Sequence, residues 1–265
     1  TGHTEYGFLG PVHGAFRPDG PGRANLSLNR MTVDRLGERQ RLLSSLDRMK
    51  RDIDSSGMMD AMDSFTSRAV GVITSGKMAD ALNLEREDPR LRDRYVLKDR
   101  NRDNHRFLMA RRLVEAGVRC VSLSWGSWDT HSNNFKTLKD QLPRLDQGLS
   151  TLIDDLDSRC MLDDTIVLCW GEFGRTPRVN GSAGRDHWSR VASVAIAGGG
   201  LKMGQAIGTS NRLGEVAKDR PVHFQEVFAT LYFKLGLDPR YTTLIDPNGR
   251  PQYLVDHREP MKELV

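Results

Sequence analysis

The feature that most constrains this chain is one long amphipathic segment, with apolar residues from 138 to 156, which lies between two short apolar runs. Its apolar residues recur at alternating spacings of three and four, which defines one buried face of a helix. Apolar runs at 118–125 and 165–170 flank the segment, and each has the length of a buried strand. Strand, helix and strand in this order predict an α/β fold with a mostly parallel sheet flanked by helices on both faces.

A third apolar run at 191–197 ends in three glycines, and a last helix is predicted over 224–235 before Gly236. Three strands are few for 265 residues, and the only earlier candidate is a weak one at 69–74. We therefore expect the N-terminal strands of the sheet to be missing. On this reading the chain is one α/β domain over 1–265 and the C-terminal part of a longer protein.

The rest of the chain divides into segments of different character. Residues 1–30 are rich in glycine and proline and are predicted to form an extended loop. Residues 31–117 are predicted to be mainly helical, with a break near 55–57 and a helix over 107–115 that stops at Gly117. The strands and the unusual polar motifs fall in 118–265.

Composition excludes some classes of protein. Hydrophobic residues make up 38% and charged residues 28%, which is typical of a soluble globular domain. No run approaches the roughly 18 apolar residues of a membrane span. The net charge of +4 comes from interspersed signs, so no nucleic-acid partner is predicted. A basic surface for acidic polysaccharide or nucleic acid remains a minor alternative, and the oligomeric state stays open.

Polar residues that suit chemistry lie next to all three apolar runs. Ligands of open α/β sheets bind beyond the carboxyl ends of strands, so these residues are expected to converge. Carboxylate and imidazole groups together suit zinc, manganese, magnesium or iron, and an arginine fork suits an anionic ester. The residues are Asp129 and His131 after the first run, Glu172 and Arg175 after the second, and Asp186 and His187 before the third.

Each of these residues also has a structural interpretation. Asp129 could cap the following helix, and His131 could be an ordinary surface histidine. Glu172 could form an ion pair with Arg175, and Asp186 could orient a neighbouring side chain. Their joint occurrence at strand ends favours a site over these separate explanations. Neither a GxSxG nucleophile elbow nor a P-loop occurs in the sequence.

Three motifs carry a family resemblance: 128–131 (WDTH), 171–177 (GEFGRTP) and 184–188 (GRDHW). In this order they resemble the bacterial family known as domain of unknown function 1501, over roughly residues 5–255. That family is grouped with the alkaline phosphatase and sulfatase superfamily. The resemblance implies an alkaline phosphatase-like fold, a divalent metal, and a small anionic ester or a sulfated or phosphorylated glycan as substrate. It also implies export to the periplasm or cell surface.

The resemblance assigns metal ligands residue by residue. Asp129 and His131 look like the first ligand set, with a shorter spacing than usual. Glu172 stands where the aspartate of a later Asp-His pair is expected. His187 resembles the late histidine ligand, with Asp186 as a ligand or as the partner of a ligand.

Two departures weaken the implied chemistry. Phe173 stands where the pattern of the superfamily expects a histidine, which puts a second metal in doubt. Nothing in residues 1–117 resembles the segment that carries the nucleophile.

Together, the residues and the resemblance predict a metal-dependent hydrolase of phosphate or sulfate esters, with Arg175 as the catalytic anion-binding residue. Zinc is the first candidate, with manganese, magnesium or calcium as others. The alternative is a non-catalytic binding or structural protein that keeps the fold.

Overall fold

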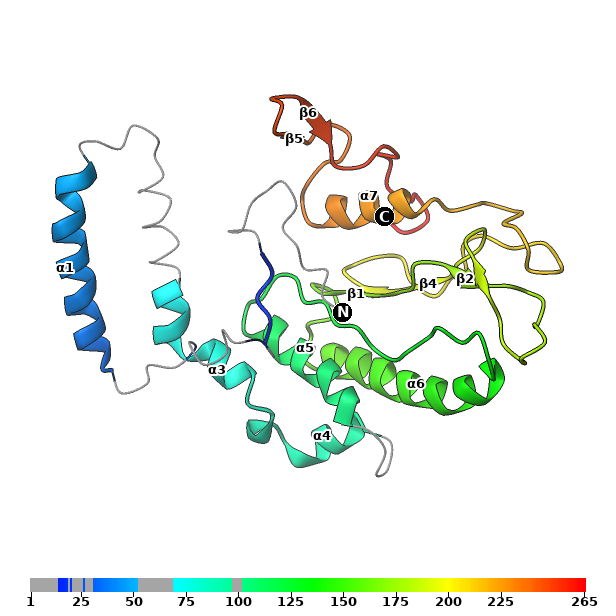
Figure 1. Ribbon diagram of the computed structural model, residues 1–265, viewed down its shortest axis with the longest axis horizontal. Helices are drawn as coiled ribbons and strands as arrows, with labels where there is room; N and C mark the ends of the chain where they lie inside the picture. The colour runs from blue at the N-terminus through cyan, green and yellow to red at the C-terminus, as the bar shows by residue number, and fades with distance from the viewer. Residues whose placement is uncertain (1–13, 19, 21–25, 27–30, 52–68, 97–101) are drawn as a thin grey trace. The chain divides into compact units, whose positions relative to one another are not determined.

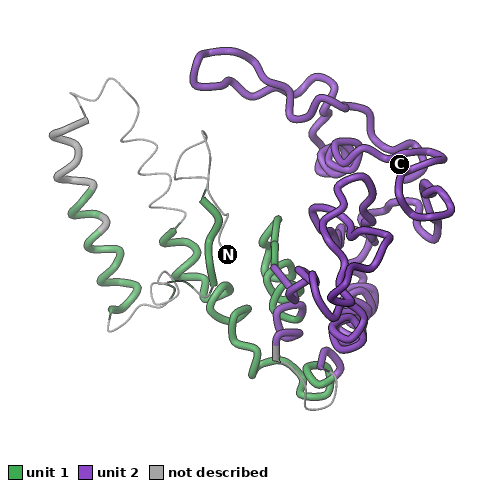
Figure 2. The backbone as a smooth tube through the Cα atoms, turned by 45° about the vertical axis from the view of Figure 1, so that its right-hand side comes forward, with its two compact units in different colours: residues 1–93, 108–123 green, residues 94–107, 124–265 purple. Residues whose placement is uncertain are grey.

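The computed structural model describes residues 14–18, 20, 26, 31–51, 69–96 and 102–265 (Figure 1). The predicted helix break near 55–57 and most of the predicted loop at 1–30 lie outside these ranges. The chain forms two compact units, which are described separately below (Figure 2). The first comprises residues 1–93 and 108–123, and the second comprises residues 94–107 and 124–265.

Helices make up the regular structure in the described part of the first unit. They are α1 (Val33–Arg51), a helical stretch at 69–75, α3 (Lys77–Ala81), η4 (Leu84–Arg86), α4 (Pro89–Arg94) and most of α5 (His105–Glu115). The weak strand predicted at 69–74 is therefore wrong. Residues 69–75 are helical, and Thr74 Oγ1 donates to Val70 O, one turn back, at 2.8 Å. With no strand beside it in the described residues, the segment satisfies its backbone groups internally.

A small apolar core holds the first unit together. Ala81, Leu82 and Leu113 are buried there, and Met78 and Met109 pack against them. Two adjacent arginines of α5 close one side of this core. The Arg112 guanidinium donates to Ala81 O at 3.0 Å and to Glu87 Oε2 at 3.0 Å, and Arg111 is paired with the same carboxylate.

The second unit is a mixture of helices and short antiparallel strand pairs. Its helices are η5 (Arg102–Asn104), α6 (Asn134–Ser158) and α7 (Phe224–Lys234). Its strands are β1 (Ile166–Trp170), β2 (Gly174–Arg175), β3 (His187–Trp188), β4 (Val194–Gly198), β5 (Thr243–Ile245) and β6 (Pro251–Tyr253). The helices predicted from the apolar positions 138 to 156 and over about 224–235 are confirmed as α6 and α7. Among the described residues, no helix combines the length and the apolar character needed to cross a bilayer.

The pair β1–β4 forms the centre of this unit. Ile166 lies opposite Gly198 and Trp170 opposite Val194, in antiparallel register. Alternate β1 residues point to one face, where they pack against a core that includes Val227 of α7. Trp170 stacks on Phe228 of the same helix with ring centroids 5.2 Å apart. Figure 1 draws the pair between α7 on one side and α6 on the other.

The predicted parallel sheet is wrong for the described residues, where the strand pairs β1–β4, β2–β3 and β5–β6 are each antiparallel. A parallel pair needs a crossover, usually a helix, whereas β1 and β4 are joined by a loop that contains β2 and β3. The apolar run at 118–125 forms no strand either. Near the end of this run, backbone carbonyl groups accept hydrogen bonds from side chains. Arg106 donates to Ser124 O at 3.0 Å, and Trp128 Nε1 donates to Trp125 O at 2.9 Å.

Close packing fixes α6 against η5. The buried Asn104 side chain donates to Tyr95 O and to Arg144 O of α6, both at 2.8 Å, and accepts from Trp125 Nε1 at 2.9 Å. Gly148 faces Phe107 across this contact. A Cβ on Gly148 would lie 2.5 Å from the Phe107 ring, so only glycine fits there without movement.

We expect Gly148→Ala to lower the free energy of unfolding by about 1–2 kcal/mol, because overpacking outweighs the roughly 1 kcal/mol that alanine gains in a helix. Chemical denaturation of the variant measures this change. Gly71→Ala is the matched control, since nothing lies within 4 Å of a Cβ at that helical position. It should be neutral or stabilising, and adding Phe107→Leu should relieve the Gly148→Ala defect. Equal effects at Gly71 and Gly148 would contradict the packing argument.

Candidate metal site

The segment that carries Asp129 is held by side chains of the second unit. Trp125 is anchored by the buried Asn104, and Trp128 donates back to Trp125 O. Gln141 of α6 binds Ser127 twice, with its Nε2 on the carbonyl at 2.9 Å and its Oε1 accepting from the amide at 3.3 Å. Asp129 therefore follows a segment, 125–128, that is held by several hydrogen bonds.

The N-terminus of α6 fixes the segment after His131. The amides of Asn133 and Asn134 donate to Ser182 O at 3.1 Å and Ala183 O at 2.9 Å. Carbonyls of the loop before β3 thus accept from two amides at the start of the helix that have no partner within the helix. Asn133 is the N-cap residue, with a left-handed backbone and no side-chain cap. The alternative role of Asp129 as the cap of this helix is therefore wrong.

The loop before β3 is built around Asn180. Its Oδ1 accepts from Ser182 N at 3.0 Å and Gly184 N at 2.9 Å, and its Nδ2 donates to His131 O at 3.0 Å. Gly184 makes the closest approach, since a Cβ there would lie 1.9 Å from His131 O. The loop and the His131 backbone are consequently in direct contact.

The short pair β2–β3 places His187. Arg175 lies opposite His187 and Gly174 opposite Trp188 in this antiparallel pair. Gly174 is required by close packing, because a Cβ would come within 2.1 Å of Val191 O. The 184–188 motif thus runs from a tight loop into the paired strand β3, and this pairing fixes the position of the His187 side chain.

Three side-chain atoms converge at this point. Asp129 Oδ1 lies 3.0 Å from His131 Nε2 and 3.0 Å from His187 Nε2, and the two imidazole nitrogens are 3.1 Å apart. All three side chains are exposed, and they form the metal-competent group found in the described residues. One ion at about 2.0–2.2 Å from each atom can share donors this close together. The donor set of one carboxylate and two imidazoles fits a divalent transition metal or zinc.

The electrostatics of Asp129 favour a cation. Hydrogen bonds from His187 and then from Arg175 lower the pKa of its carboxyl group to about 2. The group is therefore anionic throughout the neutral pH range and needs no deprotonation to bind a metal. Its exposure to solvent screens these contacts and leaves the carboxylate accessible.

Asp186 occupies the other edge of His131. Its Oδ1 lies 2.7 Å from His131 Nδ1 and 3.2 Å from Asn180 Nδ2. The hydrogen bond with His131 is the main cause that lowers the pKa of this carboxyl group. The structure thus places Asp186 beside a candidate ligand, on the side away from the three converging atoms.

Arg175 connects the site to its scaffold. Its guanidinium donates to Trp128 O at 2.7 Å, to Arg185 O at 3.2 Å and to Asp129 Oδ1 at 2.8 Å. The carboxylate partner of Arg175 is thus Asp129, where the sequence left Glu172 as an alternative. These three contacts hold the segments that carry Asp129 and His187 together.

Two residues of the 171–177 motif stand apart from this convergence. Glu172 follows β1 with an exposed side chain and is not one of the three residues whose donor atoms meet. Phe173 lies on His187, with ring centroids 4.5 Å apart. An apolar ring therefore covers one side of the His187 imidazole.

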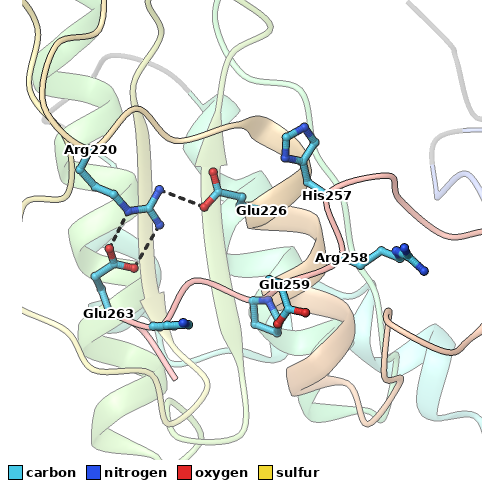
Figure 3. Close-up of a pocket in the computed structure, with 8 residues that line it drawn as sticks. Arg220, Glu226, His257, Arg258, Glu259 and Glu263 are labelled. Atoms are coloured by element: carbon cyan, nitrogen blue, oxygen red, sulfur yellow. Dashed lines mark hydrogen bonds and ion pairs between the residues drawn. The ribbon is translucent and has the colours of Figure 1, made fainter.

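A separate cleft of about 300 Å³ lies near the N-terminus of α7 (Figure 3). Its lining includes Arg220, which is held between Glu263 and Glu226: Nε donates to Glu263 Oε1 at 2.6 Å, and Nη1 lies 2.9 Å from Glu226 Oε2. The hydrogen bond from Arg220 is the main cause that lowers the pKa of Glu263 to about 2. The lining contains none of the site residues predicted from the sequence.

Asn180 supports the candidate site and was not among the residues predicted from the sequence. The available signal was turn chemistry: Asn180-Gly181-Ser182 precedes the 184–188 motif, and asparagine before glycine is typical of tight turns. That signal predicts a turn but not its partner. The contact with His131 spans 49 residues and is visible only in the folded chain.

The chain belongs to the family described as "Protein of unknown function (DUF1501)", whose model matches residues 2–265. This match confirms the family predicted from the three motifs. Comparison with curated proteins finds no match, and neither does comparison with solved structures.

We expect Gly184→Ala to disturb the site, because the new Cβ cannot coexist with His131 O at 1.9 Å. Movement of the loop should weaken zinc binding at least about 10-fold, the range seen when supporting contacts of a metal site are lost. Isothermal titration with zinc measures the loss. Gly181→Ala, in the same loop, is the control, since nothing lies within 4 Å of its Cβ. Unchanged affinity in Gly184→Ala would refute the role of this contact.

Proposed function

We propose that this chain binds a divalent metal ion through Asp129, His131 and His187. The observation that carries the proposal is the convergence of Asp129 Oδ1 with the two Nε2 atoms at 3.0–3.1 Å. Two imidazoles and an anionic carboxylate are a common ligand set for zinc, and manganese, magnesium and calcium are the other candidates. Glu172 stays a proposed further ligand. Asp186 is proposed as a ligand or as the hydrogen-bond partner of the ligand His131.

We further propose that the site belongs to a hydrolase of phosphate or sulfate esters, of the alkaline phosphatase and sulfatase superfamily. The three motifs and their order support this, together with the metal-competent group. Export to the periplasm or cell surface is part of the same proposal. The substrate would be a small anionic ester or a sulfated or phosphorylated glycan.

A bound divalent ion polarises an ester oxygen and stabilises negative charge in the transition state. The residues of the chain have separate tasks around it. Asp129 supplies an anion that is already ionised at neutral pH. Arg175 holds Asp129 in place with one Nη2 contact and is the proposed binding residue for the ester oxyanion.

A second candidate function is a non-catalytic binding or structural protein that keeps the site. The specific observation in its favour is Phe173, whose ring covers His187 at 4.5 Å between centroids. At this position the superfamily pattern expects a histidine ligand for a second metal. An apolar ring there supports a single-metal site without the paired clamp used in two-metal phosphoryl transfer.

Metal binding tests the first proposal directly. Purified protein incubated with zinc or manganese should retain about one ion per chain after desalting, measured by mass spectrometry of the metal. His187→Ala removes one of three ligands and should weaken zinc binding by about 100-fold or more. His257→Ala is the matched control, because His257 is exposed and lies outside the three-residue group. Absence of bound metal in the unaltered protein would rule out the ligand assignment.

Ester hydrolysis separates the two candidate functions. We expect the protein to hydrolyse aryl phosphates or aryl sulfates, to lose this activity with a chelator, and to regain it with zinc or manganese. Arg175→Lys should raise KM more than it lowers kcat, because the bidentate fork for the ester is lost. Stoichiometric metal without turnover on any phosphate or sulfate ester would instead support the non-catalytic role.

A further inference from the structure

We propose that the second unit carries a binding site for a neutral glycan, formed by one face of the β5–β6 hairpin and by the cleft near the N-terminus of α7. Sugar rings stack on Tyr241 and Tyr253 in this site, and their hydroxyl groups bind charged side chains of the cleft. The site is separate from the candidate metal site, because the two have no residue in common.

The first observation is a face of the hairpin with large side chains open to solvent. Thr243 lies opposite Tyr253 in the antiparallel pair. Ile245 lies opposite Pro251, and because alternate residues of a strand share a face, all four side chains are on the same one. Ile245 is 62% exposed and Tyr253 is 51% exposed, and Tyr241, just before β5, is 78% exposed. Large apolar side chains that gather at the surface mark an interaction site.

The second observation is that an arginine lies over each tyrosine ring. Arg258 Cζ is 4.1 Å from the centroid of the Tyr253 ring, and Arg240 Cζ is 5.6 Å from that of Tyr241. The two pairs adjoin, because Arg258 Nη1 donates to Arg240 O at 3.4 Å. A sugar ring has apolar C–H faces and hydroxyl groups at its edge. A tyrosine ring with a guanidinium beside it matches both parts.

Hydrogen bonds order this surface before a ligand arrives. Asp246 Oδ1 accepts from the amides of Asn248 and Arg250, both at 2.9 Å, and so closes the turn of the hairpin. The Asp238 carboxylate accepts from Arg240 Nε at 2.9 Å and from Nη2 at 2.7 Å. A ligand therefore meets side chains that are already held in place, which lowers the entropic cost of binding.

The cleft of about 300 Å³ adjoins the tyrosine face, because Arg258 also lines it (Figure 3). This volume is at the lower end of the range for small-molecule sites. The formal charges of its lining cancel, since three cationic side chains stand against three anionic ones: Arg220, Arg258 and Lys262 against Glu226, Glu259 and Glu263. Such a lining offers hydrogen-bond donors and acceptors to hydroxyl groups without an excess of either charge.

Charge and strand length favour a neutral glycan over a polyanion or an added protein strand. Residues 238–258 contain three arginines and three aspartates and no lysine or glutamate, so they lack the excess of cations that binds a polyanion. Strands β5 and β6 have three residues each, and β6 begins with Pro251, which has no amide hydrogen. Short edges of this kind resist pairing with another strand, which leaves the side chains of the face as the binding surface.

Native affinity electrophoresis tests the proposal with four soluble neutral polysaccharides: a β-glucan, a galactomannan, an arabinoxylan and dextran. At least one of them should retard the protein, equally at low and high salt and with or without a chelator. Tyr253→Ala should raise the dissociation constant about 5–10-fold, because a stacking partner is lost. Tyr253→Phe keeps the ring and should stay within about 2-fold of the unaltered protein.

Phe135→Ala is the matched control, because Phe135 is an exposed ring with Arg185 over it that belongs neither to the hairpin nor to the cleft. It should bind like the unaltered protein. If Tyr253→Ala does not fold, Tyr241→Ala decides, since the Tyr241 ring is too exposed to support a core. It should weaken binding by a similar factor.

Three results would overturn the proposal. The first is that none of the four polysaccharides retards the unaltered protein, or that both alanine variants are retarded as strongly as it is. The second is salt-sensitive binding of heparin or DNA through the two tyrosines in place of a neutral glycan. The third is a dimer, seen by sedimentation, that Tyr253→Ala dissociates, because the face would then be covered by a second copy of the chain. Loss of metal binding alters none of these outcomes.

Discussion

The site depends above all on the contact between the loop at 180–184 and the start of α6. Loop carbonyls receive the amides of Asn133 and Asn134, and the Arg185 amide donates to Thr130 O at 3.1 Å. These backbone bonds join two stretches of chain that are about fifty residues apart. These bonds bring the backbones of the two stretches together, and the side chains of His131 and His187 meet above them. Gly184 permits the contact, and any larger residue would separate the two stretches.

The helices of the second unit could be predicted from the sequence, but the strand pairing could not. The presence of α6 follows from apolar spacings of three and four, and that of α7 from an apolar stretch that stops at a glycine, which are local properties. The direction of β4 against β1 depends on the path of the chain between 171 and 193, where no periodic pattern exists. The run at 118–125 and the one at 69–74 show the same limit. Apolar residues predict burial, whereas a strand also requires a partner whose backbone groups are free.

The candidate site was partly predictable for a different reason. Asp129, His131 and His187 combine two ligand types close to predicted strand ends, so the sequence predicted that they converge. Glu172 had the same kind of signal, yet its donor atoms are not among those that meet. Asn180 acts through its amide on backbone groups, and such contacts leave no pattern of spacing or hydropathy. The sequence therefore indicated the ligand chemistry better than the scaffold that supports it.

The charges around the site link metal binding to the choice of substrate. With neutral histidines, the carboxylates of Asp129 and Asp186 outweigh the guanidinium of Arg175 by one negative charge. In that state the cluster repels a phosphate or sulfate ester, and Arg175 is already engaged by Asp129 at 2.8 Å. A divalent ion held by Asp129, His131 and His187 would reverse the sign of this net charge. Within the proposed function, it would thereby favour the approach of an anionic ester to the side of the site that carries Arg175.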